Sequence, residues 1–338
     1  MENKEFKSPE LVATVGYSFS IDTIEQLVKK LLSIDILTFR FNLSKYFFSD
    51  DIKKHLNVLA ELKKRNKQMR IMLDIPYPYQ KPRIISSNVT FMKEDDRCHL
   101  VSEMLSNDIP YIKVNFNIIS DIFEVGDILW YMDGRHSFEV TKKISSDCIE
   151  IKACESLKIE IGRSICNPKL IFKKRLESEI VEKVNDLSPE SIALSFISSR
   201  EDVLNAKRLF PKTTLISKIE SIYGVNKIDE ICCVSDVMIA RGDLILNIPI
   251  TDLYHVQKHI SSVAHKFNRK VYVATGIFTS LSSAALPNQA EMIDAVELLN
   301  INSDGLILNA GVAKGNIEQV KTILESLAKV KKNENELN

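Results

Sequence analysis

The 338-residue chain has little of several features that would mark a specialised class of protein. It has six cysteines, and no two of them form a C-x-x-C pair or a Cys/His cluster with zinc spacing. Lysine plus arginine and aspartate plus glutamate number 45 each, so the formal net charge is zero. The cysteine spacing indicates reduced, scattered thiols. The zero net charge leaves no long-range electrostatic field that would favour nucleic acid or an anionic membrane.

Long apolar runs are also missing. No segment approaches the roughly 18 residues that a membrane span needs. Residues 1–10 are charged and lack the apolar centre of a signal peptide. We therefore expect a cytoplasmic protein with no membrane partner and no nucleic-acid partner.

The composition that remains is that of an ordinary globular protein. Hydrophobic residues make up 45% and charged residues 27%, with 10 glycines and 10 prolines. The chain is long enough to bury a substantial core in one large domain, or in one domain with a smaller insert.

Short apolar, β-branched runs alternate with segments of helical periodicity along most of the chain. The predicted strands are residues 11–15, 36–41, 69–73, 192–196, 214–217, 237–240, 271–274 and 305–308. The predicted helices are residues 21–32, 50–65, a segment from near 199, 222–232, 253–267, 291–299 and 317–327. Alternating strands and helices imply a parallel sheet covered by helices, and a count of eight strands favours an α/β fold of the (β/α)₈ TIM-barrel type.

The alternation is interrupted between about residues 83 and 163. Residues 125–130, 137–140 and 147–153 alternate in polarity like antiparallel strands, and Asp133-Gly134 is a turn signal. We therefore predict a small β-barrel domain inserted after the third strand. The predicted organisation is barrel over 1–82, inserted β domain over 83–163, barrel over 164–330, and a disordered tail over 331–338.

Charged and polar residues directly follow several of the predicted strands. In a (β/α)₈ barrel, chemistry takes place at the C-terminal ends of the strands. The residues in question are Arg40, Asn42 and Ser44 after the second strand, Asp74 after the third, Lys218 and Glu220 at the fifth, and Arg241, Gly242 and Asp243 after the sixth.

These residue types suit a metal-assisted anion site. Glu220 and Asp243 could offer hard oxygen ligands to Mg²⁺ or Mn²⁺. Lys218 and Arg40 would add positive charge, and Gly242 would let backbone N–H groups approach a phosphate. Each signal alone is weak, because Lys-x-Glu is usually a solvated pair, Arg-Gly-Asp an ordinary turn, and Arg40 could be a snorkelling rim residue. Their coincidence at the strand ends of one barrel indicates a site.

At these residues the sequence resembles pyruvate kinases, from the first strand to about residue 327. Residues 240–244 match the family's A-R-G-D-L outright, and residues 217–220, with Gly224-Val225 behind them, resemble S-K-I-E-N-x-x-G-V. The further matches, in order, are residues 13–16 (T-I-G-P), 40–44 (R-x-N-x-S), Asp133-Gly134 (D-D-G of the lid), Gln257-Lys258, Ala274-Thr275 and 313–315 (A-K-G). Matches in order over some 300 residues make the resemblance specific.

The resemblance implies roles on the phosphoenolpyruvate side. Lys218 would stabilise charge on the transferring phosphoryl group and on its enolate partner. Glu220 and Asp243 would bind the divalent metal, and Gly242 and Asp243 would contact the substrate. Thr275 would contact the substrate carboxylate or the proton-delivery site, and Arg40 would hold the phosphoryl group.

The resemblance also implies a monovalent-cation site and a nucleotide site. The K⁺ ligands would be Asn42, Ser44, Asp74 and the backbone carbonyl of Ile75. The nucleotide would be bound by Arg40, by Lys45 in place of a family histidine, and by Arg163, which stands where a lysine of the lid is expected. The implied activity moves a phosphoryl group between phosphoenolpyruvate and ADP, giving pyruvate and ATP.

The chain departs from the family mainly on the nucleotide side and at the lid hinge. The family's D-T-K-G-P-E-I-R reads D-I-P-Y-P-Y-Q-K-P-R at residues 74–83, with Arg83 as a loose counterpart of the arginine. The motifs S-G-E-T-A-K-G, P-T-R-A-E and T-Q-M-L-E-S are altered at residues 309–315, 287–291 and 275–280. The lid is shortened and no C-terminal regulatory domain is matched, so we expect a monomer or a homodimer.

Three interpretations stay open. The first is a minimal pyruvate kinase. The second is a paralogue that uses the metal–enolate site on another phosphoryl partner, or on a carbon–carbon bond as a lyase or aldolase does. The third is a non-catalytic binding or regulatory relative. A relative without activity tends to lose charged site residues, whereas Lys218, Glu220 and Asp243 are all present.

Overall fold

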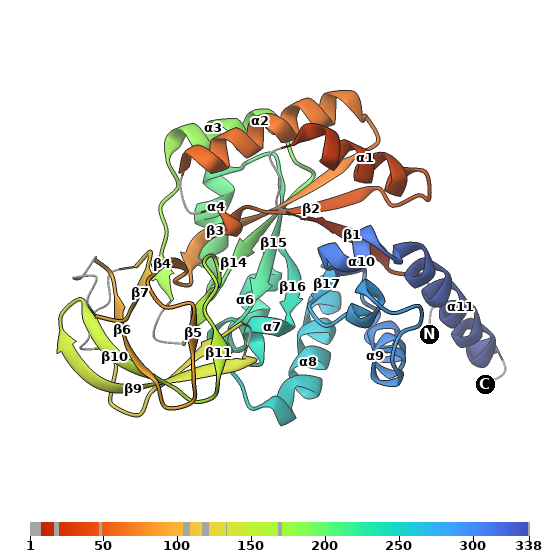
Figure 1. Cartoon of the computed structure of the whole chain (residues 1–338). Helices are drawn as coiled ribbons and strands as arrows, with labels where there is room; N and C mark the ends of the chain where they lie inside the picture. Colours follow the sequence, from red (N-terminus) through yellow and green to blue (C-terminus); the bar gives the residue numbers. More distant parts are fainter. Residues whose placement is uncertain are drawn as a thin grey trace. The chain divides into compact units, whose positions relative to one another are not determined.

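Eight parallel strands in the described part of the chain close into a barrel (Figure 1). The computed structural model describes residues 8–16, 20–46, 49–103, 109–116, 122–132, 134–167 and 171–336. The strands, in barrel order, are β1 (Glu10–Val15), β2 (Thr38–Asn42), β3 (Arg70–Gln80), β14 (Ser191–Ser195), β15 (Thr214–Ile219), β16 (Asp236–Ala240), β17 (Val271–Ala274) and β18 (Gly305–Leu308). Because β18 pairs with β1, Leu306 opposite Leu11, the predicted (β/α)₈ barrel is confirmed.

The chain divides into two units, the barrel unit (Met1–Pro78 with Arg175–Asn338) and the β unit (Tyr79–Lys174). The β unit is wider than the predicted 83–163, because β3 continues to Gln80 and pairs there with β13 (Phe172–Lys173).

Helices cover the outside of the barrel (Figure 1). They are α1 (Ile21–Leu32), α2 (Ser49–Arg65), α3 (Ser178–Leu187), α4 (Arg200–Leu209), α5 (Ile222–Asn226), α6 (Ile228–Cys232), α7 (Arg241–Leu244), α8 (Leu253–Lys266), α9 (Gln289–Asn300), α10 (Ala310–Lys314) and α11 (Ile317–Glu336), with short 3₁₀ turns η1 (Leu43–Lys45), η4 (Ile250–Asp252) and η5 (Thr279–Ser282). In α1, Ile24, Val28 and Leu31 are buried on one face, which is the spacing of an amphipathic helix.

Two apolar layers hold the barrel together. Inside it, a small buried cluster takes one or two side chains from each of seven strands: Val12, Met72, Ala193, Ile216, Met238, Tyr272, Ala274 and Ile307. The alternate strand residues point outward into the larger core beneath the helices. The strand ends that rise from these layers are therefore rigid supports for a site.

The β unit is built on a seven-stranded sheet within its described residues. The order is β12 (Ile165–Cys166), β8 (Ile128–Tyr131), β9 (His136–Ser145), β10 (Cys148–Ala153), β6 (Arg97–Val101), β7 (Tyr111–Val114) and β4 (Ile84–Ser87). A bridge between Arg83 and Ser164 joins the two edge strands, so the sheet closes on itself as the predicted small β-barrel does. A two-stranded sheet, β11 (Leu157–Lys158) with β5 (Phe91–Met92), is added to it.

Several predicted elements differ from the structure. The predicted helix over 222–232 is two short helices, α5 and α6, separated at Lys227. Helix α3 was not predicted, although its buried Ile180, Val184 and Leu187 have helical spacing. The predicted disordered tail over 331–338 is wrong as far as Glu336, because lysine and glutamate favour the continuation of an existing helix and α11 extends through them. Asp133 of the predicted turn lies outside the described residues, and its neighbour Gly134 has a φ of 82°.

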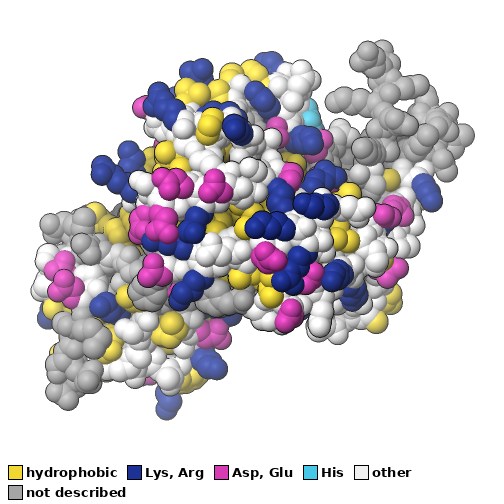
Figure 2. Space-filling model, turned by 90° about the horizontal axis from the view of Figure 1, so that it is seen from above, with side chains coloured by type: hydrophobic (Ala, Val, Ile, Leu, Met, Phe, Trp, Pro, Cys, Tyr) yellow, Lys and Arg dark blue, Asp and Glu magenta, His cyan; other side chains and the backbone are white. Residues whose placement is uncertain are grey.

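The surface carries both signs of charge side by side. Figure 2 shows basic and acidic side chains interspersed on one face, as the zero net charge leads one to expect. Among the helices of the described ranges, none has both the length and the apolar character that crossing a bilayer requires.

Candidate active site

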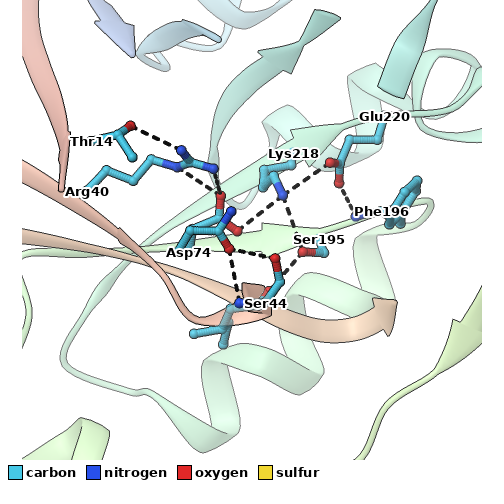
Figure 3. A network of polar contacts seen from close by, with 10 residues as sticks. Thr14, Arg40, Ser44, Asp74, Ser195, Phe196, Lys218 and Glu220 are labelled. Atoms are coloured by element: carbon cyan, nitrogen blue, oxygen red, sulfur yellow. Dashed lines mark hydrogen bonds and ion pairs between the residues drawn. The ribbon is translucent and has the colours of Figure 1, made fainter. Parts of the chain in front are cut away.

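Lys218 lies at the centre of a buried ion-pair network at the C-terminal ends of the barrel strands (Figure 3). Its Nζ is 3.1 Å from Asp74 Oδ1 on β3 and 3.1 Å from Glu220 Oε1 just beyond β15. It also donates to Ser195 Oγ on β14, at 3.3 Å. Burial alone would lower the pKa of Lys218, but the charges of Asp74 and Glu220 outweigh burial and raise it. The side chain is therefore a fixed ammonium ion.

Arg40, on β2, adds a second cation to the same carboxylate. Its Nε and Nη2 donate to Asp74 Oδ2 at 3.0 and 2.6 Å, and its Nη1 donates to Thr14 Oγ1 on β1 at 3.1 Å. Asp74 is fully buried. Burial would raise the pKa of Asp74, but the charges of Lys218 and Arg40 more than offset it and hold that pKa below its usual range. Asp74 thus stays ionised and keeps both cations in place.

Glu220 has the opposite character. Its Oε2 accepts a hydrogen bond from the backbone N–H of Phe196 at 2.7 Å, and its side chain is 2% exposed. Burial raises the pKa of Glu220 to about 7, because the nearby charges of Asp243 and Asp74 add to it and Lys218 opposes it only in part. Glu220 is a carboxylate whose negative charge is incompletely balanced by the protein.

Asp243 and Thr275 stand on the neighbouring strand ends. Asp243 lies in α7, which begins directly after β16, and its charge acts on both Lys218 and Glu220. The short helix approaches the end of β17 closely: a Cβ on Gly242 would come 2.9 Å from Thr275 Cγ2 and 3.2 Å from its Oγ1. Gly242 is therefore needed for this contact, and the structure brings the predicted substrate residues 242, 243 and 275 to one edge of the barrel.

The residues predicted to bind K⁺ are neighbours. Asn42 and Asp74 are paired across β2 and β3. Asn42 Oδ1 accepts from the backbone N–H and the Oγ of Ser44 at 3.0 and 2.6 Å. The carbonyl of Ile75 accepts from Ser195 Oγ at 2.9 Å. The oxygen atoms are thus gathered, and each already has a hydrogen-bond or ion-pair partner within the protein.

The residues predicted to bind nucleotide belong to two different units. Arg40 belongs to the network, and Lys45 is exposed at the end of η1. Arg163 belongs to the β unit, where its Nε pairs with Glu160 Oε2 at 2.8 Å.

The sequence analysis missed three groups that touch the network, namely Thr14, Ser195 and the backbone N–H of Phe196. Thr14 and Ser195 are at the C-terminal ends of their strands, so the rule that selected Lys218 could have selected them too. The Phe196 amide left no signal in side-chain chemistry. Phe196 has a φ of 51°, and its N–H donates to Glu220.

The donor set fits a divalent cation that prefers oxygen. Across the described residues, no group of three or more His, Cys, Asp or Glu side chains could hold a metal by itself. A metal here would be held by Glu220, Asp243 and oxygens of a ligand, which is the arrangement Mg²⁺ commonly takes. The raised pKa of Glu220, caused by burial and then by Asp243, reflects negative charge that a cation would neutralise.

The comparisons with known proteins point to one family. The family model described as "Pyruvate kinase, barrel domain" matches residues 6–321. The pyruvate kinase of Thermotoga maritima is 28% identical over 341 residues, covering 96% of this chain and 71% of that protein. The pyruvate kinase of Thermococcus litoralis is 25% identical, covering 96% of this chain and 69% of that protein.

Solved structures show the same fold. The crystal structure of Cryptosporidium parvum pyruvate kinase superposes with a TM-score of 0.78 at 23% identity, covering 98% of this chain and 72% of that one. The crystal structure of the enzyme from Pyrobaculum aerophilum gives 0.71 at 24% identity, covering 94% and 72%. With the family model matching most of its length, this chain belongs to the pyruvate kinase family.

Proposed function

We propose that the protein transfers a phosphoryl group between phosphoenolpyruvate and ADP, giving pyruvate and ATP, with Mg²⁺ or Mn²⁺ and K⁺. The observation that carries the proposal is the position of Lys218, whose ammonium group lies 3.1 Å from the carboxylates of Asp74 and Glu220 at the mouth of the barrel. Phosphoryl transfer depends on positioning and charge neutralisation more than on covalent chemistry of the protein. A rigid pair of cations, Lys218 buried and Arg40 partly buried, beside the proposed acidic metal ligands meets that need.

Each residue of the site has a separate role in the proposed reaction. Arg40 and Lys218 hold the phosphoryl oxygens, and Lys218 stabilises the negative charge on the enolate oxygen as the phosphoryl group leaves. Asp74 keeps both cations in position. Glu220 and Asp243 would hold the divalent metal, which would supply positive charge to neutralise the substrate. Thr275 contacts the substrate carboxylate or the proton-delivery site.

The monovalent cation and the nucleotide complete the proposed site. K⁺ would be held by oxygens of Asn42, Ser44, Asp74 and Ile75. Arg40 and Lys45 bind the phosphates of ADP.

A paralogue that acts on another partner is the second candidate. It is favoured by the segment that follows Asp74, where the family pattern is rewritten and β3 continues as a strand to Gln80. The cations and acids around Lys218 would then serve a different phosphoryl acceptor, or enolate chemistry at a carbon–carbon bond, with the same charge balance.

A ³¹P NMR experiment tests the proposal. Wild-type protein is incubated with phosphoenolpyruvate, ADP, Mg²⁺ and K⁺, and a parallel sample of pyruvate in D₂O is followed by ¹H NMR. Formation of ATP is the expected result. Exchange of the pyruvate methyl protons without ATP would favour the paralogue. Neither signal, in protein that is folded by circular dichroism, would overturn both and leave a binding or regulatory protein.

A further inference from the structure

Arg241 connects helix α9 to the end of strand β17. Its Nη1 and Nη2 donate to the two carboxylate oxygens of Asp294 at 2.6 and 2.8 Å. Its Nε donates to the backbone carbonyl of Thr275 at 2.9 Å. One guanidinium group thus joins α7, α9 and the residue predicted to meet the substrate.

The geometry of the guanidinium makes this link directional. Because the group is planar and always charged, a two-point contact with one carboxylate fixes both its plane and its orientation. With Asp294 holding Nη1 and Nη2, the remaining Nε–H can point in one direction only. That direction is the Thr275 carbonyl.

Thr275 has a backbone that needs such support. Its φ is 77°, in the left-handed region that a β-branched side chain rarely adopts, and Gly276 follows at 79°. Strained backbone of this kind persists where surrounding groups hold it, and it is concentrated at functional sites. Here the carbonyl is held by Arg241, and the side chain lies against Gly242.

Asp294 itself is held by a rigid element. Helix α9 begins with a capping box between Asn288 and Glu291, and its buried Ala295 and Leu298 pack into the core. The Asp294 side chain is 28% exposed, so its pair with Arg241 lies near the surface. A two-point pair of this kind can add some stability, but stability does not depend on where the third donor points. The direction of the Arg241 Nε–H, and hence the hold on the Thr275 carbonyl, does depend on the pair.

We propose that Asp294 is a positioning residue: acting through Arg241, it fixes the Thr275 backbone and so places the Thr275 hydroxyl towards the substrate. The role of Thr275 at the substrate rests on the proposed function. The link from Asp294 to the Thr275 backbone does not, and it can be tested separately.

A double-mutant cycle tests the kinetic consequence. Asp294→Asn should lower kcat by about 10- to 100-fold, since a misplacement of about 1 Å at a reacting group costs that much. The melting temperature and the Kd for Mn²⁺ should stay close to wild type. In a Thr275→Ala background, the same Asp294→Asn change should have almost no further effect. Glu297→Gln, on the same helix, is the matched control and should leave kcat unchanged.

Two kinetic results would overturn the proposal. One is an unchanged kcat in Asp294→Asn. The other is an equal loss of kcat in the presence and absence of the Thr275 side chain, which would mean that Asp294 acts by another route.

A crystal structure of Asp294→Ala separates this proposal from the proposed function. We expect Thr275 to leave the left-handed region and its carbonyl to lose the bond to Arg241. A Thr275 backbone that is unchanged in this variant would contradict the positioning role. If the wild type forms no ATP, the proposed function fails and this structural result still decides the positioning role.

Discussion

At the scale of single residues, the site depends on an imbalance of charge around Lys218. When ionised, Asp74, Glu220 and Asp243 bring three negative charges, and Arg40 and Lys218 bring two positive ones. Asp74 forms ion pairs with both cations. Glu220 has a pKa of about 7, which is raised mainly by burial and further by the charge of Asp243. The unbalanced part of the network is therefore the part that we propose as the metal site.

Replacing the ammonium tests the central cation. Lys218→Met should lower phosphoryl transfer by at least about 10²- to 10³-fold, because the group that stabilises the developing charge is gone. The barrel should remain folded, since Glu220, with its pKa already at about 7, can take up a proton when its partner is lost. Turnover is measured in a coupled pyruvate assay and folding by circular dichroism.

Lys227→Met is the matched control for this change, because Lys227 is an exposed lysine that pairs with Glu230. It should leave turnover as it is. Wild-type turnover in Lys218→Met would remove Lys218 from the mechanism.

Replacing Asp243 tests the metal site. Asp243→Ala should abolish Mn²⁺ binding at the barrel mouth, because Glu220 alone offers too few oxygen ligands. Titration calorimetry with Mn²⁺ measures this, and Asp252→Ala, an exposed aspartate in η4, serves as the control. Mn²⁺ affinity equal to that of the wild type in Asp243→Ala would move the metal elsewhere.

Much of the site could be predicted at this scale, because charged residues that follow apolar strands are visible in the sequence. Lys218, Glu220, Arg40 and Asp74 were found in this way, and the structure brings them together. The link from Asp294 to Thr275 could not be found. It joins positions far apart in the chain through a backbone carbonyl, and neither the carbonyl nor the left-handed backbone has a sequence signature here.

At the scale of elements, short turns at the strand ends set the positions of the residues proposed to bind the metal ions. The turn η1 begins where Asn42 accepts from Ser44, and α7 begins where β16 ends. Such elements of three or four residues have too little periodicity to be recognised in a sequence, so the long helices and strands were predicted and these were not. Helix α3 was also not predicted, because it follows the inserted unit, which interrupts the alternation of strands and helices.

The turn η1 leads to a prediction about K⁺. Replacing K⁺ by tetramethylammonium should reduce activity, because the oxygens of Asn42, Ser44 and Asp74 would lose the cation that they are proposed to share. Steady-state rates at constant ionic strength measure the effect. Activity that does not respond to K⁺ would mean that these oxygens do not bind a catalytic K⁺, and that another cation such as Lys45 supplies the charge.

The start of helix α9 leads to a prediction about stability. Glu291 accepts hydrogen bonds from Thr279 Oγ1 at 3.0 Å and from the N–H groups of Ser280 and Asn288 at 2.8 and 3.2 Å, and it also accepts from Ser280 Oγ. Glu291→Gln should lower the free energy of unfolding at pH 7 by about 1 kcal/mol, as the loss of a cap or a charged hydrogen bond does. Chemical denaturation measures it, with Glu297→Gln as the control.

The pH dependence of that difference follows from the pKa of Glu291. Burial would raise this pKa, but the hydrogen bonds from Ser280, Thr279 and Asn288 outweigh burial and lower it. A carboxyl group whose pKa is lowered by folding adds stability above its unfolded pKa of about 4.3 and loses it as the pH falls through the folded value. The gap between wild type and Glu291→Gln should therefore shrink below about pH 4. A gap that is constant down to pH 3 would contradict the charged role.

At the scale of the whole molecule, eight barrel strands, most of the helices between them and one inserted β unit were predictable from sequence, and the reason is physical. Strands buried on both faces read as continuous apolar runs, and the helices between them are amphipathic, so the pattern repeats along the barrel. The bounds of the β unit were predicted less well, because β3 continues as one strand from the barrel unit into the β unit. Of the residues predicted to bind nucleotide, Arg163 belongs to the β unit.

The most direct test of the account is a crystal structure with Mn²⁺ and phosphoenolpyruvate, using the anomalous signal of manganese. We predict one peak within about 2.0–2.4 Å of carboxylate oxygens of both Glu220 and Asp243, with the phosphate against Lys218 and Arg40. A manganese peak that lies away from either carboxylate, or a phosphate that does not meet Lys218, would contradict the account.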